Sequence, residues 1–463
     1  MSLEIVILAA GKGKRMLSDL PKVLHPVAGR PMLEMVIKTA SLLDPTHIHV
    51  VVGHHAELIE QSLNALPDSL RSRIDCVLQS EQLGTGHAVS CALPNIKDDS
   101  LVLVLYGDTP LTPAQVLGDF IIESQKHDLC VLSAYAEDPF GYGRIVRDNL
   151  GKLEYIVEER DASEQTKLIH EINTGIICAK ASILKKWLPK IRNNNSQGEY
   201  YLTDLAGMLV ESGQNVGLSM APDFSVLTGV NTKSQLAFAE RTYQHMQAEQ
   251  LMRKYGVTLA DPSRIDIRGE LICGKDCYID VNCVFEGKVE LGNRVRIEAG
   301  CVIKDCKIGD DSIISPYTVM ESSLMKKHTT VGPFARLRPG NILEDEVHIG
   351  DFVEVKKSVI GKGTKAGHLS YLGDAQLGAG VNVGAGTITC NYDGANKHRT
   401  IIGDDVFIGS DTQLVAPVNV PTGVTIAAGT TYTSKIKAAE NDLVISRVNG
   451  LCINGYQRPR KEK

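Results

Sequence analysis

The segment EIVILAAGKGKRM, residues 4–16, places four consecutive apolar residues, Ile5–Leu8, directly before a loop rich in glycine and positive charge. A short apolar run that stops at glycine is typical of a buried strand ending in a turn. Three cations lie in the loop between Lys12 and Arg15, and Lys22 follows soon after. The chain has a net charge of −6, so this cluster is a local feature and indicates an anion site, with a solvated basic turn as the alternative.

The first 230 residues alternate short apolar runs with helical patterns. The runs that predict strands are EIVILAA, HIHVVVG, IDCVLQS, SLVLVLYGD and DLCVLSAYA, and PMLEMVIKTASLL is one of the helical patterns between them. Continuous apolar strands separated by helices predict a mostly parallel sheet covered on both faces. Ligands of such sheets bind at the carboxyl ends of the strands, which is where the glycine loop begins.

The second half of the chain has a different period, because an apolar or cysteine residue recurs every six positions. These positions are Ile267, Cys273, Ile279, Phe285, Leu291, Ile297 and Ile303, and later Ile402, Ile408, Leu414, Val420 and Ile426. A period of six fits neither a helix nor a flat alternating strand and predicts a triangular parallel β-helix with three hexads in each coil. The segment CNYDGANKHRT, residues 390–400, breaks the register and predicts a loop thrown out of a coil.

A length of 463 residues predicts two domains. We place an α/β domain at residues 1–233, a linker helix at 234–254 and a β domain at 255–463. Apolar runs are too short for a membrane span or a signal peptide, and the acidic balance gives no support for nucleic-acid binding. Eleven cysteines without paired spacing predict reduced thiols in a cytoplasmic protein, and CGKDC lacks the partners of a zinc site.

The glycine loop matches neither common phosphate-binding motif. The chain has no GxxxxGK[ST], and Met16 occupies the third glycine position of GxGxxG. Asp108 follows an apolar run at a point where a carboxylate could hold Mg²⁺, and Asn231 offers a neutral oxygen. Gln79, Gly84 and Thr85, in QSEQLGTGHA, suit base edges and close backbone approach.

Several longer motifs carry a family resemblance. LAAGKGKRM, LPK, EQLGTGHA, YGD, GYGRI, INTGI and NNNSQGEYYLTDL resemble sugar nucleotidyltransferases with the Rossmann-like, glycosyltransferase-A type fold. Together with the hexads, ARLRPG, KAGHLSYLGD and NVGAGTITCNYDGANKHRT, the whole chain is similar to the bacterial bifunctional N-acetylglucosamine-1-phosphate uridylyltransferase/glucosamine-1-phosphate N-acetyltransferase family. Lys14 departs from the family, which often has Thr or Ser there, and no role is carried onto it.

For the first domain, the resemblance implies Mg²⁺-dependent uridylyl transfer from UTP to N-acetylglucosamine-1-phosphate, with release of pyrophosphate. Arg15 and Lys22 would neutralise charge during the transfer, and Asp108 and Asn231 would bind Mg²⁺. The nucleotide-sugar site would comprise Leu8, Ala9, Ala10, Gly11, Lys22, Gln79, Gly84, Thr85, Tyr106, Gly107, Asp108, Gly143, Glu158, Asn173 and Asn231.

For the second domain, the resemblance implies a left-handed β-helix that acetylates the amine of glucosamine-1-phosphate with acetyl-CoA. His368, on an outward-facing position of a hexad, would be the general base. Arg338, Lys356, Tyr371 and Asn382 would bind glucosamine-1-phosphate, and Ala385, Asn391, Tyr392, Ser410, Ala428 and Arg447 would bind acetyl-CoA. Glu354 could orient sugar hydroxyls. The family forms homotrimers, acetylates before it uridylylates, and supplies precursors of peptidoglycan and lipopolysaccharide.

Two alternatives stay open from the residues alone. The first is a sugar-1-phosphate nucleotidyltransferase whose β-helix is a scaffold or regulatory module. The second is a non-enzymatic assembly subunit. His368, Lys356 and the 390–400 loop argue against the first, and the glycine loop with Asp108 and Asn231 argues against the second. The sequence does not determine kinetic constants, transfer of the intermediate between sites, the number of metal ions, or regulation.

Overall fold

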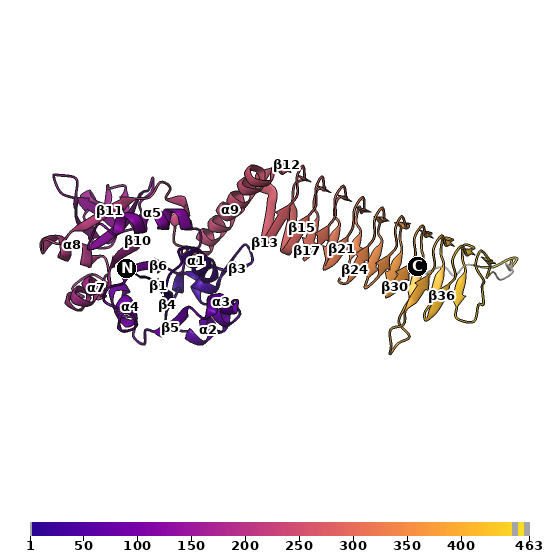
Figure 1. Ribbon diagram of the computed structural model, residues 1–463, viewed down its shortest axis with the longest axis horizontal. Helices are drawn as coiled ribbons and strands as arrows, with labels where there is room; N and C mark the ends of the chain where they lie inside the picture. Colours follow the sequence, from indigo (N-terminus) through magenta and orange to yellow (C-terminus); the bar gives the residue numbers. More distant parts are fainter. Residues whose placement is uncertain (1, 447–451, 458–463) are drawn as a thin grey trace. The chain divides into compact units, whose positions relative to one another are not determined.

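The computed structural model describes residues 2–446 and 452–457. The chain divides into two compact units, residues 1–243 and 244–463. The division falls within α9 (Lys233–Gln250), which continues as a π-helix over Leu251–Tyr255. Each unit has its own core, and each is described by itself below (Figure 1). In the described ranges no helix is both long and apolar enough to cross a bilayer.

The N-terminal unit is built on a mostly parallel sheet, as predicted. Its strand order is β11 (Val216–Met220), β7 (Leu129–Tyr135), β10 (Glu171–Lys180), β6 (Leu101–Tyr106), β1 (Leu3–Leu8), β4 (His47–Val52) and β5 (Ile74–Leu78). The five predicted apolar runs are β1, β4, β5, β6 and β7. Only β10 runs against its neighbours β6 and β7 along this path, and β8 (Arg144–Arg147) and β9 (Leu153–Val157) extend from it in the part of the chain described. A small hairpin, β2 (Pro26–Val27) and β3 (Arg30–Pro31), stands apart.

Helices cover both faces of this sheet, which confirms the second part of the prediction. One face packs on α1 (Met32–Ser41), α2 (Ala56–Asn64) and α5 (Ala114–Ser124), and the other on α4 (Thr85–Ala92), α7 (Ala181–Trp187) and α8 (Asp204–Glu211). The short α3 (Asp68–Arg71) and α6 (Glu164–Lys167) have no buried residues. Along β1, Ile5 and Ile7 enter one core and Val6 the other, which explains why the run is apolar throughout.

The C-terminal unit is a parallel β-helix with three walls. The first wall is β12 (Thr258–Leu259), β14 (Tyr278–Ile279), β16 (Arg296–Ile297), β19 (Ile313–Ile314), β22 (Thr330–Val331), β25 (His348–Asp351), β28 (Lys365–His368), β31 (Asn382–Val383), β34 (Phe407–Ile408), β37 (Thr425–Ile426) and β39 (Leu443–Val444). The second starts with β13 (Ile265–Cys273) and β15 (Cys283–Leu291) and continues with β17 (Val302–Lys304), β20 (Val319–Glu321), β23 (Arg336–Leu337), β26 (Glu354–Lys356), β29 (Tyr371–Gly373), β32 (Ile388–Cys390), β35 (Gln413–Val415) and β38 (Thr431–Thr433). The third uses the ends of β13 and β15, then β18 (Lys307–Ile308), β21 (Ser323–Met325), β24 (Asn341–Leu343), β27 (Val359–Ile360), β30 (Ala375–Leu377), β33 (Thr400–Ile402) and β36 (Val418–Val420).

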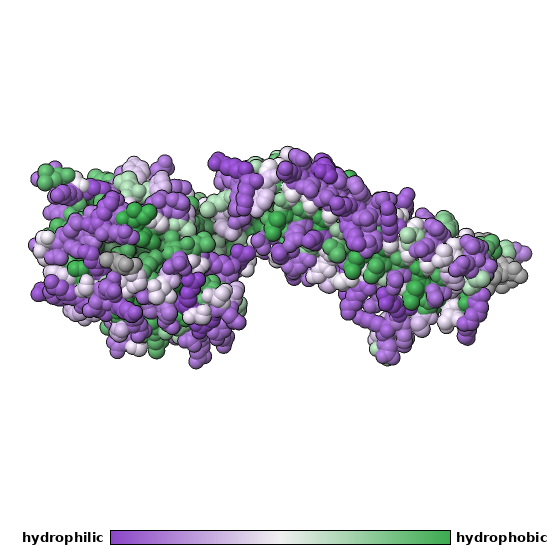
Figure 2. All heavy atoms as spheres, in the orientation of Figure 1, coloured by the Kyte–Doolittle hydropathy of each residue, from purple (hydrophilic) through white to green (hydrophobic). Residues whose placement is uncertain are grey.

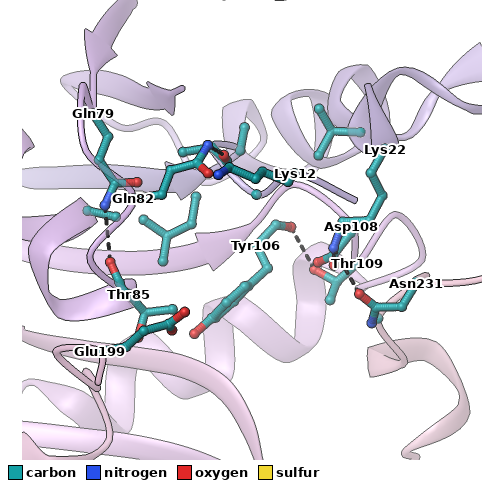
Figure 3. A pocket seen from close by; sticks show the side chains of 18 of the residues that line it. Lys12, Lys22, Gln79, Gln82, Thr85, Tyr106, Asp108, Thr109, Glu199 and Asn231 are labelled. Carbon is teal, nitrogen blue, oxygen red and sulfur yellow. Dashed lines mark hydrogen bonds and ion pairs between the residues drawn. The ribbon is translucent and has the colours of Figure 1, made fainter. Parts of the chain in front are cut away.

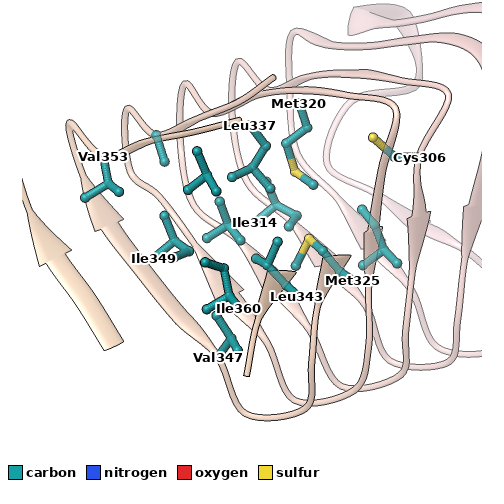
Figure 4. Packing of buried hydrophobic residues seen from close by; sticks show 14 of the residues in the cluster. Cys306, Ile314, Met320, Met325, Leu337, Leu343, Val347, Ile349, Val353 and Ile360 are labelled. Carbon is teal, nitrogen blue, oxygen red and sulfur yellow. The ribbon is translucent and has the colours of Figure 1, made fainter. Parts of the chain in front are cut away.

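The hexad positions form the interior of these coils. All twelve residues of the predicted six-residue period are buried, from Ile267 to Ile426. Figure 4 shows the side chains of successive coils, such as Ile314, Leu337 and Ile360, pointing inward toward one another. Because each coil buries its apolar ladder only against the next coil, stacking supplies the core that a single coil lacks. All eleven cysteines are free thiols, as expected from their spacing.

Candidate functional site

The N-terminal unit has a pocket of about 780 Å³ at the carboxyl ends of β1 and β6. Eleven of the predicted nucleotide-sugar residues line it: Leu8, Ala9, Ala10, Gly11, Lys22, Gln79, Gly84, Thr85, Tyr106, Asp108 and Asn231. They come from segments that are far apart in sequence and converge because parallel strands end at one edge of the sheet (Figure 3). Three lysines and Arg160 belong to the lining, against the acidic Asp108 and Glu199.

Lys22 joins the two residues predicted to bind Mg²⁺. Its ammonium forms a short ion pair with Asp108 Oδ2 and donates a hydrogen bond to Asn231 Oδ1 over 3.0 Å. Both ends of the ion pair are largely buried, with side-chain exposures of 14% and 12%. Two oxygens from separate segments thus converge on one cation, and a carboxylate with a neutral oxygen is a donor set that suits Mg²⁺. The residues present therefore fit the metal that the sequence predicts.

The glycine loop packs directly against Lys22. Gly13 has φ +58°, and a Cβ at this position would lie 2.7 Å from the Cβ of Lys22. The following 3₁₀-helix, Lys14–Met16, is anchored by Met16, which is buried. Glycine at this position therefore lets the cationic loop fold over the lysine that contacts Asp108.

A second loop, residues 79–84 between β5 and α4, closes the pocket from the side of β5. Gln79 Nε2 donates to the carbonyl of Gly84 over 3.1 Å, and Gln82 Nε2 donates to the carbonyl of Ala10 over 2.6 Å. The hydroxyl of Thr85 accepts a hydrogen bond from the backbone of Leu202. These bonds fix the second loop against the first, so the strand ends form a walled site.

The predicted sugar-binding residues lie on the β8–β10 side of the unit. Asn173 donates its backbone N–H to the carbonyl of Gly143 over 2.8 Å. Glu158 accepts a hydrogen bond from Thr203 Oγ1, and burial raises the pKa of its carboxyl group. Burial also raises the pKa of the Tyr106 phenol, with Glu158 and Asp108 adding to the effect. Tyr106 itself lines the pocket.

Five predicted residues lie outside the lining of the pocket among the residues described: Gly107, Gly143, Glu158, Asn173 and Arg15. Gly107 is buried and bonds the carbonyl of Leu8, while Arg15 is exposed on the 3₁₀-helix. Lys12 and Lys14, which belong to the predicted cationic cluster, also line the pocket. Sequence reasoning missed other lining residues: Val23, Gln82, Ala88, Thr109, Tyr142, Arg160, Thr174, Gln197, Glu199, Leu227 and Gly229. Gln82 and Glu199 were detectable, because both lie inside motifs quoted for the resemblance.

In the β-helix, His368 projects outward as predicted, with 69% of its side chain exposed. Asp351 is its register partner one coil earlier, and His368 Nδ1 lies 2.5 Å from Asp351 Oδ1. A carboxylate accepts, so Nδ1 carries the proton and Nε2 presents its lone pair outward. This is the orientation that a carboxylate gives to a histidine acting as a general base.

Three predicted acetyl-CoA residues share one column with His368. Ala366, Val383, Ile408 and Ile426 are successive ladder partners, and His368, Ala385, Ser410 and Ala428 follow them at two positions' distance. The backbone N–H of Asp411 donates to the carbonyl of Ala385, and the backbone N–H of Gly429 donates to the carbonyl of Ser410, so the column keeps its register. The side chains that follow His368 in this column, Ala385, Ser410 and Ala428, are all small.

A cationic cluster lies on the second wall. Leu337 pairs with Val355 in the adjacent coil. Arg338 and Lys356 are the residues that follow this pair, so they occupy matched positions in the two coils. The nearby ammonium of Lys397 lowers the pKa of Lys356, and Arg338 adds to the effect. Arg338 also pairs with Glu354 over 3.1 Å. Three neighbouring cations with one carboxylate form a site suited to a phosphate group.

Lys397 belongs to the predicted loop. Asn382 pairs with Phe407, 25 positions on, whereas Lys365 pairs with Asn382, 17 positions on. The longer coil confirms that a segment is thrown out of the register. Asn391 Nδ2 donates to Asp374 Oδ2 over 2.5 Å.

Of the other residues predicted for the second site, Tyr392 is exposed in this loop and Tyr371 lies beside Glu354 on the second wall. Asn382 is exposed on the first wall, so the predicted residues come from two walls and the loop that leaves the second. Arg447 lies outside the described residues.

Comparisons with known proteins give separate matches for the N-terminal unit and for the β-helix. Residues 5–171 match the family model for the MobA-like NTP transferase domain. Residues 267–360 match the GMPPB C-terminal domain, and residues 399–434 match the hexapeptide repeat of succinyl-transferase. The family matches thus identify a nucleotidyltransferase domain in the N-terminal unit and hexapeptide repeats in the β-helix.

Solved structures give weaker similarity. A putative glucose-1-phosphate thymidylyltransferase from Bacillus anthracis is 20% identical, with TM-score 0.44, covering 52% of this chain and 94% of that one. The apo structure of a UDP-glucose pyrophosphorylase is 16% identical, with TM-score 0.45, covering 53% of this chain and all of that one. The assignment of a nucleotidyltransferase domain therefore rests on the family matches.

Glycine at position 84 is required by its surroundings. It has φ +112°, and a Cβ would lie 2.7 and 2.8 Å from backbone atoms of Tyr200. We expect Gly84→Ala to displace the second loop and weaken nucleoside triphosphate binding at least tenfold, measured by isothermal titration calorimetry. Gly151→Ala is the matched control, because Gly151 has φ +77° with nothing within 4 Å. Equal affinities in the two variants would contradict the role of the loop.

Proposed function

We propose that the protein is a bifunctional enzyme that makes UDP-N-acetylglucosamine. The observation that carries the uridylyl half is the convergence of Lys22, Asp108 and Asn231 at the floor of a cationic pocket. The observation that supports the acetyl half is the Asp351–His368 pair at the head of a column of small residues. The reaction would occur in cytoplasm, where UTP and acetyl-CoA are available.

In the uridylyl site, an oxygen of N-acetylglucosamine-1-phosphate attacks the α-phosphorus of UTP, and pyrophosphate leaves. The protein supplies no nucleophile, so its contribution is positioning and neutralisation of charge. The glycine loop and its lysines bind the phosphates, and the second loop binds the base. Asp108 and Asn231 would hold Mg²⁺, which when bound neutralises charge on the phosphate oxygens.

In the acetyl site, the amine of glucosamine-1-phosphate attacks the thioester carbonyl of acetyl-CoA. His368 Nε2 accepts the proton released from the amine and passes it to the sulfur as the C–S bond breaks, so coenzyme A leaves as the thiol. Arg338, Lys356 and Lys397 bind the sugar phosphate, and the column from Ala385 to Ala428 accommodates the pantetheine arm. Asp351 holds the imidazole with Nε2 toward the amine.

We also propose that the chain forms a homotrimer. Tyr317, Phe334 and Phe352 stack along one corner of the β-helix with centroid separations of 5.3 and 5.5 Å. All three side chains are about half exposed in the single chain. An exposed apolar row of this kind supports burial against another copy. A monomeric mass in solution by analytical ultracentrifugation would contradict this part of the proposal.

The two activities should separate by mutation. We expect Asp108→Ala to lower pyrophosphate release by about 10²-fold or more and leave acetylation unchanged. His368→Ala should lower thiol release from acetyl-CoA by about 10²–10⁴-fold and leave uridylyl transfer unchanged. Both reactions are assayed on one sample of each folded variant. Wild-type protein that releases pyrophosphate but no thiol would instead identify the β-helix as a scaffold.

The carboxylate at position 351 should act through the orientation of His368. We expect Asp351→Asn to lower kcat for acetyl transfer at least tenfold, with KM for both substrates nearly unchanged, because the amide no longer fixes the imidazole tautomer. Glu346→Gln is the control, since Glu346 is an exposed carboxylate five positions before Asp351 and pairs with Lys362 of the next coil. Unchanged kcat in Asp351→Asn would show that His368 needs no such partner.

A further inference from the structure

The side chain of Gln79, which directly follows β5, is held from two sides. Its Nε2 donates to the carbonyl of Gly84 over 3.1 Å and lies 3.0 Å from Nδ1 of His87, a residue near the start of α4. Only 4% of Gln79 is exposed, although the residue lines the pocket. Its two neighbours therefore decide which atom of this amide meets a ligand.

The carbonyl of Gly84 fixes the direction of the amide. A carbonyl oxygen only accepts hydrogen bonds, so the atom of Gln79 that faces it is the nitrogen, which carries two hydrogens. The second hydrogen is available to His87 Nδ1, which then accepts. A neutral imidazole that accepts at Nδ1 carries its proton at Nε2.

The other side of His87 agrees with this tautomer. Cys91, one turn further along α4, lies with its Sγ 3.9 Å from His87 Nε2. A thiol sulfur is a weak acceptor, so it suits an Nε2–H group. His87 Nδ1 is thus left as the acceptor on the side that faces Gln79.

With both amide hydrogens of Gln79 engaged, its carbonyl oxygen is the polar atom left for a ligand. Within the described residues no group donates to Oε1. Figure 3 shows the amide oxygen of Gln79 turned toward the interior of the pocket. A flipped amide would break both hydrogen bonds and set Oε1 against the carbonyl oxygen of Gly84, so this end of the pocket presents an acceptor.

We propose that His87 is a positioning residue that makes the pocket selective for a nucleobase with an imide N–H, such as uracil. The inference rests on the proposed uridylyl transfer and adds the side chain that keeps the base-reading amide in one orientation. The N3 of uracil carries a hydrogen and can donate to Gln79 Oε1. The N3 of cytosine carries a lone pair, so the same pose would set two acceptors against each other.

His87 acts through Gln79 alone. Among the described residues that line the pocket, His87 is absent, so its influence on a bound base passes through the amide. Without the acceptor at position 87, one N–H of Gln79 has no protein partner. The flipped amide then costs one hydrogen bond instead of two, and the preference for an imide weakens.

The test measures kcat/KM for UTP and for CTP by pyrophosphate release from the full chain, with Mg²⁺ and N-acetylglucosamine-1-phosphate. We expect wild-type protein to prefer UTP by about 10²-fold or more. His87→Leu should lower this ratio about tenfold, the effect of one hydrogen bond. His87→Asn places Oδ1 near the position of Nδ1 and should keep the wild-type ratio.

Ser90→Ala is the matched control in α4, because Ser90 Oγ bonds the carbonyl of Gly86 within the same helix. This variant should keep the wild-type ratio. A purely structural defect in His87→Leu would lower kcat/KM for both nucleotides equally and leave the ratio unchanged. Far-UV circular dichroism reports folding, and His87→Ala removes the same acceptor if His87→Leu does not fold.

The outcomes separate this inference from the proposed function. An unchanged ratio in His87→Leu, with wild-type protein active, overturns the role of His87 and leaves uridylyl transfer standing. Equal use of UTP and CTP by wild-type protein overturns the selection of an imide by this site. Release of pyrophosphate from neither nucleotide overturns the proposed uridylyl transfer and the inference with it.

Discussion

The ion pair of Lys22 with Asp108 ties together the site of the N-terminal unit. Three segments meet at this ammonium, and the hydrogen bond to Asn231 spans 209 positions of sequence. Such convergence depends on the parallel sheet, whose strand ends place distant loops at one edge. Because the side chains of Lys22 and Asp108 are largely buried, their charges interact strongly.

The glycine loop and the lysines around this ion pair make the pocket lining locally positive. An acidic protein repels a polyphosphate at long range, and the cationic lining reverses that field locally. The surface of the N-terminal unit in Figure 2 is mostly hydrophilic, with hydrophobic residues visible among the polar ones. The phosphate-binding character thus resides in a few side chains held by backbone geometry, rather than in the composition of the unit.

Much of the fold could be predicted because its signals are local. The apolar runs of β1, β4, β5, β6 and β7 and the six-residue period each depend on neighbours within a few positions, and the burial of Ile267 and Ile426 follows from that period. The glycine loop and Asp108 were also readable as strand-end features. Contacts that depend on the register between strands could not be predicted from the sequence. Asp351 meets His368 only because a coil returns after 17 positions.

The loop within residues 390–400 shows how the β-helix accommodates an insertion. The coils on either side of it stay in register, since Phe407 resumes the ladder of Asn382 and Thr425 continues it. The length of one coil can therefore change without a change in the pairing of the later strands, because the extra residues bulge outward. Such an architecture lets evolution lengthen, shorten or exchange an outward loop without disturbing the stacked interior.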